Sequence, residues 1–468
     1  MEVEAWLARA ARARPERTAL ATPRGDWSYA RLHAAARAGA GELAQRGARR
    51  GERVAIALPA GPEFAQALHA CLLLGAVAVP VDLRLSGGER AQVAAGAGVV
   101  VEEPLREHGR DADAARPGGE THELDAVALV IHTSGTSAAP RPVELTYGNL
   151  LWSALGSAVA LGLDPDERWL CTLPLSHVGG LSILVRSAIY ATTAVLHERF
   201  ESERALDALA RGEATLVSLV ATTLARLLDA GLERPPALRC ALTGGGPVPE
   251  PLLARARAAG VPVSLTYGLT ESCSQATTTP VAALADAAAA PGADAAAAPE
   301  ADAPAAPDAG PPLFCTQLRI APASAAEGDG EILLRGPTIA PGSLAGDGWL
   351  HTGDLGTLDR AGRLRVSGRK ADTIVSGGEN VAPAEVEAVL EGHPAVLEAA
   401  VVGRPDERWG EAVTAWVVVR PDAELDLGEV RALCAERLAP YKVPKEFTLS
   451  ERPLPRTRSG KLLRRELR

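Results

Sequence analysis

Short apolar runs along the chain alternate with longer amphipathic stretches. Residues 126–131 form such a run between polar residues, which predicts a buried strand. Residues 53–58 and 76–81 have the same character, and an amphipathic helix is predicted between them at 62–74. This strand–helix–strand order predicts parallel α/β structure. It continues in predicted strands at 169–173, 194–196, 215–219, 238–243 and 261–266, and predicted helices at 29–45, 180–190, 222–230 and 250–259.

The order breaks at 280–312, which is nearly all Ala, Pro, Asp and Gly and holds too few large apolar groups for a core. We expect most of it to be a flexible surface insertion. Two strands of an antiparallel unit are predicted after it, and a different pattern of short strands and helices begins near residue 370. The predicted fold is α/β. It has a large N-terminal domain of stacked α/β sheets plus a distorted antiparallel unit (1–370) and a small mobile α+β C-terminal domain (371–468).

Composition narrows the range of partners and compartments. The 468 residues carry a formal net charge of −10, which argues against a nucleic-acid partner. The six cysteines form no CxxC pair, so neither a zinc site nor a disulfide framework is indicated, and a reducing cytoplasm fits better. The N-terminus lacks an apolar signal core, and the longest apolar stretch, 70–81, is too short to span a bilayer.

The loop His132-Thr133-Ser134-Gly135-Thr136-Ser137 directly follows the predicted strand at 126–131. Its central glycine lets backbone N–H groups turn toward a polyanion, and its hydroxyls add donors. A plain polar turn is the alternative, and the loop is not a GxxxxGK[ST] phosphate loop. The turns at 243–247 and 266–272 also follow strands. Ligands of parallel sheets bind beyond the carboxyl ends of the strands, so we expect all three turns to meet at one crevice.

Seven ordered motifs together resemble the adenylate-forming superfamily of acyl-CoA synthetases, peptide-synthetase adenylation domains and luciferases. They are HTSGTSAAP at 132–140, LTGGGPVP at 242–249, TYGLTES at 266–272, GWLHTGDLG at 348–356, SGRKAD at 367–372, SGGENV at 376–381 and TRSGKLLR at 457–464. Four stretches look like the o-succinylbenzoate–CoA ligases of menaquinone biosynthesis. These are LPLSHVGGLSILVRSAIYATTAVLHERF at 173–200, GGGPVPEPLL at 244–253, TYGLTESCSQ at 266–275 and PLFCTQLRI at 312–320.

The resemblance implies an AMP-forming acid–CoA ligase that uses ATP, Mg²⁺ and coenzyme A. Lys461 would neutralise the carboxylate and the α-phosphate as they meet, and Glu271, with Thr136, would hold the metal. The remaining nucleotide contacts that it implies are Thr133, Ser134, Gly135, Thr136 and Ser137 for the β- and γ-phosphates, Thr270 for the α-phosphate, Gly244, Gly245, Gly246, Pro247, Thr266, Tyr267 and Gly268 for adenine, and Asp354 with Arg369 for ribose.

The acyl and thiol sides follow from the same resemblance. His177 would gate the acyl pocket, although a lone histidine is often structural. Arg186, Ser274 and Gln275 are candidates by position for the second carboxylate of o-succinylbenzoate, and Arg186 could instead lie on the outside of its helix. Gly377 and Gly378 would open a path for the pantetheine arm. The small domain would rotate about a pivot near 370–372 between the two steps. Homo-oligomerisation is compatible with the family.

The chain departs from the family pattern at the end of the phosphate loop. Ala138, Arg141 and Pro142 stand where the family usually has Gly, Lys and Gly, so a compact cation becomes a planar fork. Two other functions therefore stay open: a ligase for another aromatic or fatty acid, and a nucleotide-binding relative without turnover. Retention of Lys461, Glu271 and Asp354 argues against the second.

Overall fold

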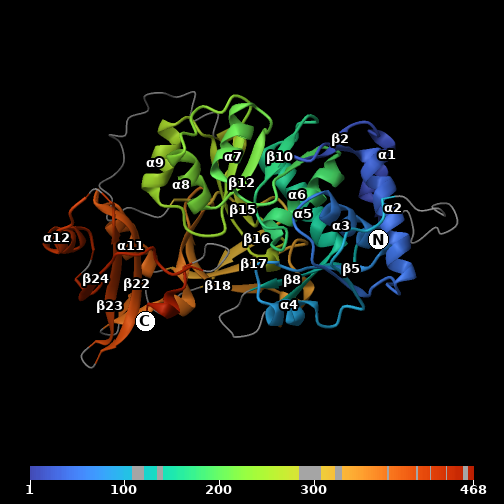
Figure 1. Ribbon diagram of the computed structural model, residues 1–468. Coiled ribbons are helices and arrows are strands. Elements are labelled where there is room, and N and C mark those ends of the chain that lie inside the picture. The colour runs from blue at the N-terminus through green and yellow to red at the C-terminus, as the bar shows by residue number, and fades with distance from the viewer. Residues whose placement is uncertain are drawn as a thin grey trace.

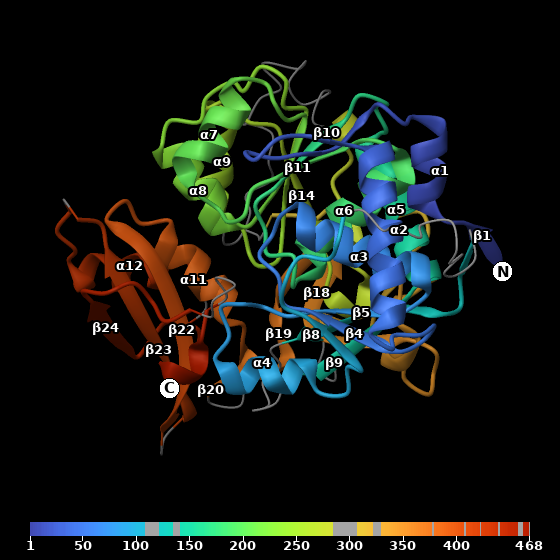
Figure 2. The same cartoon turned by 45° about the vertical axis from the view of Figure 1, so that its right-hand side comes forward.

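The protein is described here from a computed structural model (Figure 1). It describes residues 1–107, 121–133, 141–283, 307–321, 329–376, 379–406, 409–421, 423–438, 440–456 and 462–467. Figures 1 and 2 both show the C-terminal residues as a small lobe to one side of a larger body, with the two chain ends far apart.

The larger body contains a mostly parallel sheet of eight strands in the order β15-β14-β13-β12-β10-β11-β2-β3. Alternate residues of its central strands face opposite cores: Trp169 and Cys171 pack with one set of helices, and Leu170 packs with another. Burial on both faces explains why these strands are continuous apolar runs. Their bounds are Thr18–Ala21 (β2), Trp27–Ser28 (β3), Arg168–Cys171 (β10), Thr193–Leu196 (β11), Leu216–Leu219 (β12), Cys240–Thr243 (β13), Val263–Tyr267 (β14) and Thr277–Thr278 (β15).

A second sheet has five strands in the order β6-β4-β5-β8-β9. Its inner face shares one apolar core with the first sheet and with α1, α2, α3, α5 and α6, so these helices lie between the two sheets. The strands are Arg53–Ile56 (β4), Val77–Pro80 (β5), Val99–Val101 (β6), Val127–Thr133 (β8) and Arg141–Thr146 (β9), and a separate pair joins Glu2–Glu4 (β1) to Thr121–Glu123 (β7).

The helices predicted at 29–45, 62–74, 180–190, 222–230 and 250–259 are present, each within two residues of its predicted ends, whereas those at 87–94, 147–161 and 202–210 were not predicted. Those of the shared core are Trp6–Ala13 (α1), Tyr29–Gln45 (α2), Pro62–Leu74 (α3), Tyr147–Leu161 (α5) and Val178–Tyr190 (α6). The outer faces of the two sheets are covered by Gly87–Ala94 (α4), Ser202–Ala210 (α7), Ala221–Asp229 (α8) and Glu250–Ala258 (α9). The alternation of sheets and helices confirms the predicted α/β class.

An antiparallel sheet in the order β16-β17-β18-β19 adjoins this body. Its strands are Gln317–Ile320, Gly330–Arg335, Leu350–Leu358 and Leu364–Arg369, with a 3-10 turn, η3, at Pro341–Ser343. The ends of the Ala/Pro-rich stretch are part of the fold, unlike the flexible insertion expected over 280–312: the Ala309 N–H donates to Leu364 O, and Pro312 pairs with Thr277. Its middle, 284–306, lies outside the described residues.

The small lobe has its own apolar core, built from residues 374–447. Its sheet runs β21-β20-β23-β22, with β24 parallel to β23. The elements are Ile374–Ser376 (β20), Glu379–Val381 (β21), Pro383–Glu391 (α11), Val396–Asp406 (β22), Gly410–Val419 (β23), Leu427–Arg437 (α12), Glu446–Ser450 (β24) and Arg464–Glu466 (η5). The 3-10 turn Lys370–Asp372 (η4) joins it to β19. The domain boundary after residue 370 stays a prediction.

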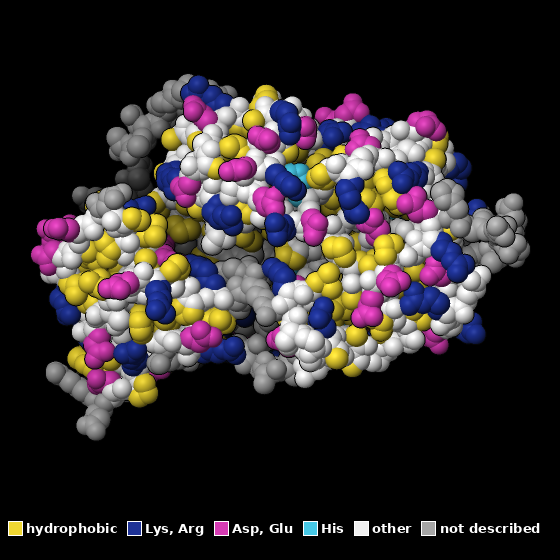
Figure 3. Space-filling model, in the orientation of Figure 1, with side chains coloured by type: hydrophobic (Ala, Val, Ile, Leu, Met, Phe, Trp, Pro, Cys, Tyr) yellow, Lys and Arg dark blue, Asp and Glu magenta, His cyan; other side chains and the backbone are white. Residues whose placement is uncertain are grey.

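The surface in Figure 3 mixes acidic and basic side chains instead of gathering one sign into a stripe. In the described part of the chain no helix is long and apolar enough to cross a membrane.

Candidate active site

Two of the three predicted turns lie side by side at the carboxyl ends of β13 and β14. These strands are parallel, with Thr243 opposite Leu265, so the glycine-rich turn and the 266–272 turn leave the sheet together. A Cβ on Gly244 would lie 2.6 Å from the Thr266 carbonyl oxygen, so only glycine fits this approach. Gly245, with a φ of +79°, Gly246 and Pro247 are exposed. The turns therefore offer a flat backbone surface beside the sheet edge.

Tyr267 links this edge to the antiparallel sheet. Its hydroxyl donates to Asp354 Oδ2 at 2.8 Å, and Arg369 Nε contacts Asp354 Oδ1 at 2.9 Å. Asp354 and Arg369 are register partners on β18 and β19, so Asp354 lies in a strand. Burial and the Asp354 charge raise the pKa of Tyr267 above its usual range, which keeps its hydroxyl protonated as a donor. Asp354 is thus a fixed, buried acceptor beside the two turns.

Of the third turn, at 132–137, the structure describes only the first residues and the strand that follows it. Thr133 ends β8, and its hydroxyl donates to the Arg141 carbonyl at 3.4 Å. Ser134, Gly135, Thr136 and Ser137, with Ala138, lie outside the described residues. The following strand, β9, lies against the 3-10 turn Thr270–Ser272 (η1), so the strand that leaves the loop neighbours the turn that carries Glu271.

Glu271 is half-buried and forms no ion pair with any residue that the structure describes. Nor do these residues contain a group of three His, Cys, Asp or Glu side chains that would hold a metal by themselves. Magnesium typically takes only one or two protein carboxylates and completes its shell with substrate phosphates and water. A lone carboxylate at the turn fits that donor set.

Arg186 is the largest fully buried side chain, with only 2% of its surface exposed, so the alternative that it lies on the outside of its helix is wrong. Its Nη2 donates to Ser153 Oγ at 3.0 Å, and the same hydroxyl donates to the Cys273 carbonyl at 2.6 Å. Among the residues that the structure describes, its Nε has no hydrogen-bond partner and no carboxylate pairs with it. Burial lowers the pKa of Arg186. A buried guanidinium with an unused donor favours an anionic ligand.

Ser274 and Gln275 follow Cys273 on the same turn. A Cβ on Gly268 would overlap the Ser274 carbonyl at 1.6 Å, so Gly268 and Ser274 are in direct backbone contact. Gln275 Nε2 donates to Thr278 Oγ1 at 2.8 Å, whereas its buried Oε1 has no hydrogen-bond partner in the described part of the chain. The fold therefore brings Ser274 and Gln275 against the 266–272 turn, and Arg186 reaches Cys273 through Ser153.

His177 caps the N-terminus of α6, the helix that carries Arg186. Burial lowers the pKa of His177; Arg84 lowers it further, whereas Asp82 raises it. The imidazole is therefore neutral at neutral pH. The loop after β5 that supplies Asp82 and Arg84 was missed by sequence reasoning, because neither residue falls in a recognisable motif.

In the small lobe, Gly377, Gly378 and Lys461 lie outside the described residues, but the chain on either side of 457–461 is fixed. Arg456 and Leu462 pair as an antiparallel bridge. On one side Arg456 Nη2 meets Glu398 Oε2 at 2.5 Å, and the Leu454 N–H donates to Glu398 Oε1 at 2.8 Å.

The other side is held by Arg464. Its Nη2 lies 2.7 Å from both oxygens of Glu387 on α11, and its Nη1 lies 3.6 Å from Asp372 in η4. We refer to the four residues Glu387, Glu398, Arg456 and Arg464 as the tail clasp. Its two ion pairs attach one end of the segment that carries Lys461 to β22 and the other end to α11. Sequence reasoning missed it, because partners so far apart in the chain leave no local pattern.

In a comparison with known protein families, residues 7–344 match the AMP-binding enzyme family, and residues 385–461 match the AMP-binding enzyme C-terminal domain. The chain therefore belongs to the AMP-binding enzyme family, and the resemblance found in its motifs is confirmed.

Two similar relatives are 2-succinylbenzoate–CoA ligases. The protein of Bacillus subtilis (strain 168) is 38% identical, and that of Geobacillus kaustophilus (strain HTA426) is 39% identical; each alignment covers 99% of this chain and 97% of the relative. Among solved structures, o-succinylbenzoate coenzyme A synthetase (MenE) from Bacillus subtilis in complex with the acyl-adenylate OSB-AMP has a TM-score of 0.85 at 37% identity, covering 100% of this chain and 98% of that one. The same enzyme with ATP and magnesium also has a TM-score of 0.85, with 100% of both chains covered.

Proposed function

We propose that this protein is an ATP-dependent o-succinylbenzoate–CoA ligase that works through an acyl-adenylate. The observation that carries the proposal is the buried Asp354, held by Tyr267 and Arg369 beside the exposed glycine turn. A carboxylate fixed in this way suits the paired hydroxyls of a ribose, and the turn suits a flat base. The full-length likeness to 2-succinylbenzoate–CoA ligases supports the acyl substrate.

In the first step a carboxylate oxygen of the acid attacks the α-phosphorus of ATP, and the bond to pyrophosphate breaks. Both reactants are anions, so the step needs positive charge and fixed donors. Lys461 supplies the mobile charge, and Thr133, with the loop that follows it, binds the β- and γ-phosphates while Thr270 binds the α-phosphate. Glu271 and Thr136 would hold magnesium, which would supply positive charge to offset that of the phosphates.

In the second step the thiolate of coenzyme A attacks the acyl carbon, and AMP leaves with one oxygen of the original carboxylate. The thiol proton passes to solvent. Gly377 and Gly378 form the passage for the pantetheine arm. The small domain, 371–468, rotates about Lys370–Asp372 so that Lys461 and this passage reach the cleft in turn.

The second carboxylate of o-succinylbenzoate is assigned to Arg186. A buried guanidinium whose Nε has no protein partner is stabilised when an anion enters. Ser274 and Gln275 line the same turn and add polar contacts, while the neutral His177 closes the entrance. An acid without a second carboxylate would leave Arg186 uncompensated, which disfavours the alternative of a fatty-acid ligase.

The proposed partners are small molecules: the acid, ATP and coenzyme A. The proposed compartment is the cytoplasm, where both nucleotides are available and where the six unbridged cysteines stay reduced.

A panel of acids tests the proposed activity. Pyrophosphate release is measured with o-succinylbenzoate, benzoate and a medium-chain fatty acid, each with ATP, Mg²⁺ and coenzyme A, and the thioester is identified by mass. We expect turnover with o-succinylbenzoate and at most trace turnover with the others. Turnover with the fatty acid alone would overturn the substrate assignment. Absence of turnover with every acid, despite ATP binding, would instead support a non-catalytic nucleotide-binding protein.

A further inference from the structure

Helix α5 presents an uncharged face to solvent. Residues Tyr147–Leu161 include no Asp, Glu, Lys or Arg, although the helix lies at the surface along one side. Its most exposed side chains are Trp152, Leu155 and Val159, and 67% of Val159 is exposed. A surface helix normally turns a charged or polar face outward, and a helix that is apolar all round is normally covered. The outward face of α5 therefore has the composition of a buried one.

Two residues beyond the helix extend this face. The rings of Trp152 and Phe314 lie 6.3 Å apart between centroids, and 59% of Phe314 is exposed. Leu163 follows the C-terminal end of α5 and is also exposed. We define the α5 patch as Trp152, Leu155, Val159, Leu163 and Phe314. Aromatic residues together with aliphatic ones, and the absence of charge, are typical of the centre of a protein–protein interface.

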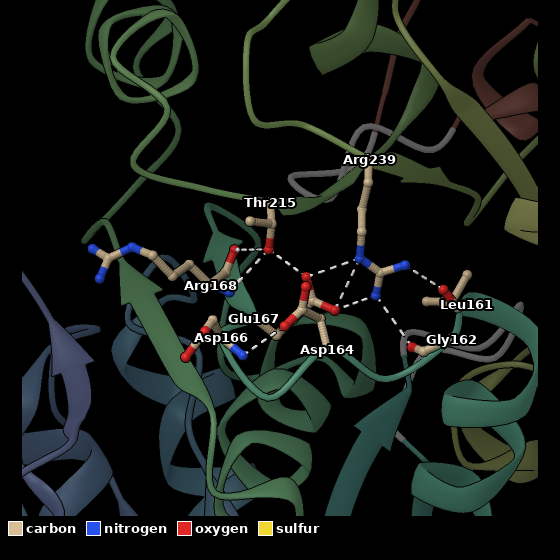
Figure 4. A network of polar contacts seen from close by, with 8 residues as sticks. All are labelled: Leu161, Gly162, Asp164, Asp166, Glu167, Arg168, Thr215 and Arg239. Atoms are coloured by element: carbon tan, nitrogen blue, oxygen red, sulfur yellow. Dashed lines mark hydrogen bonds and ion pairs between the residues drawn. The ribbon is translucent and has the colours of Figure 1, made fainter. Parts of the chain in front are cut away.

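The patch is held rigidly. At the end of α5 the carbonyls of Leu161 and Gly162 accept hydrogen bonds from Arg239, which also pairs with the buried Glu167 (Figure 4). Near its start, Asn149 Nδ2 donates to the Ile339 carbonyl at 3.0 Å, and in its second half Gly156 packs against Leu313, where a Cβ would lie 3.0 Å from Leu313 Cδ1. A surface fixed at both ends loses little conformational entropy when it is covered.

The area of the patch fits a symmetric dimer. Taking roughly 150–250 Å² for each whole large side chain, the exposed fractions of the five residues give about 380–630 Å² of apolar surface per copy. A stable interface buries about 800 Å² per partner, of which about 56–65%, or roughly 450–520 Å², is apolar. The patch thus supplies about the apolar area that one half of such an interface contains.

We infer that the α5 patch is the contact through which two copies of this chain form a dimer with twofold symmetry, helix α5 facing helix α5. The same face on both copies is self-complementary because it carries no charge to repel its equivalent. A membrane surface is disfavoured as the occupant, because the patch has no lysine or arginine to attract anionic lipid. The inference does not depend on the acyl substrate.

The test is the mass of the full-length protein in solution, measured by sedimentation over micromolar concentrations. We expect a dimer for the unchanged protein and a monomer for the Leu155→Glu/Val159→Glu double variant. Each substitution enters the interface twice, so the dimer dissociation constant should rise by about 100-fold or more. Leu397→Glu places the same charge on an exposed leucine of the small lobe and should leave the dimer intact.

Folding and other occupants are checked in the same variants. Leu155 and Val159 are exposed, so the double variant should keep the unfolding temperature and the rate of pyrophosphate release. A monomeric unchanged protein would overturn the inference, as would a dimer that survives the double variant. Binding of the unchanged protein to vesicles of phosphatidylcholine and phosphatidylserine, abolished in the variant, would assign the patch to a membrane and likewise overturn it.

Discussion

Neutralising Glu387 by Glu387→Gln should slow adenylation while sparing thioester formation. Glu387 accepts both contacts from Arg464 Nη2 and also accepts the Val401 N–H at 2.8 Å. Glutamine keeps the shape and can still accept from Val401, but it removes the charge that holds Arg464. The tail segment that carries Lys461 then loses one of its attachments to the small lobe.

The size of the effect follows from burial. The side chains of Glu387 and Arg464 are 11% and 19% exposed. Removal of one partner from a buried ion pair costs about 3–5 kcal/mol. The partial exposure of Arg464 and its second carboxylate, Asp372 at 3.6 Å, reduce this to about 2 kcal/mol. Since 1.36 kcal/mol corresponds to tenfold in rate, adenylation should fall by about 10- to 30-fold.

Two half-reactions are measured separately. Adenylation is followed as acid-dependent exchange of pyrophosphate into ATP, and thioester formation is followed from supplied acyl-adenylate and coenzyme A. The matched control is Glu385→Gln on the same helix. It breaks the contacts of 2.6 and 2.8 Å from Lys442 Nζ to Glu385 without touching the tail. This control should lose stability without a selective loss of adenylation.

Equal losses in both half-reactions for Glu387→Gln would refute the reasoning, because they would indicate general damage to the small lobe. Unchanged adenylation in a variant whose Arg464 contact is demonstrably lost would refute it as well.

Three further changes test other parts of the account. Lys461→Ala should lower adenylation by about 10²–10³-fold and leave ATP affinity, measured by calorimetry, nearly unchanged; an equal loss of thioester formation from supplied acyl-adenylate would contradict the role of Lys461. Arg186→Met should raise the KM for o-succinylbenzoate at least about tenfold while leaving the weak use of benzoate unaffected, and parallel losses for both acids would contradict the carboxylate assignment. Burial lowers the pKa of His69 to about 4 and that of His122 to about 3. Between about pH 6.5 and 4 the unfolded chain therefore binds protons that the native chain does not. The free energy of unfolding, measured in urea, should fall by up to about 1.4 kcal/mol per pH unit for each histidine, and a profile unchanged by His122→Gln would count against this origin.

The sequence was most informative where periodicity and local signals agree. Helices α2 and α3 begin and end at the residues predicted for them, because Ser28 caps the first and Pro62 starts the second. The short strands β2 and β3 were missed, since four and two residues give too little pattern. The hairpin β22–β23 extends beyond the two strands that the pattern predicts at 396–403 and 412–419, because cross-strand pairing lengthens strands past their apolar runs.

At the site, sequence order predicted the turns but not the contacts across them. The pairing of Tyr267 with Asp354 joins two sheets, and the tail clasp joins residues 58 and 77 positions apart, so neither leaves a local signature. For Arg186 a signal was present. Arg186 is the only charged residue of α6, which has apolar residues on every side. A helix without a polar face is normally buried, so its one charged side chain is expected to be buried too.

The central claim is that the acid is activated by transfer to the α-phosphorus, and an isotope measurement tests it most directly. o-Succinylbenzoate labelled with ¹⁸O in its carboxylates is turned over with ATP and coenzyme A, and the products are weighed by mass spectrometry. The account predicts AMP that carries one ¹⁸O atom and pyrophosphate that carries none. Unlabelled AMP, or label in a phosphate other than that of AMP, would contradict it.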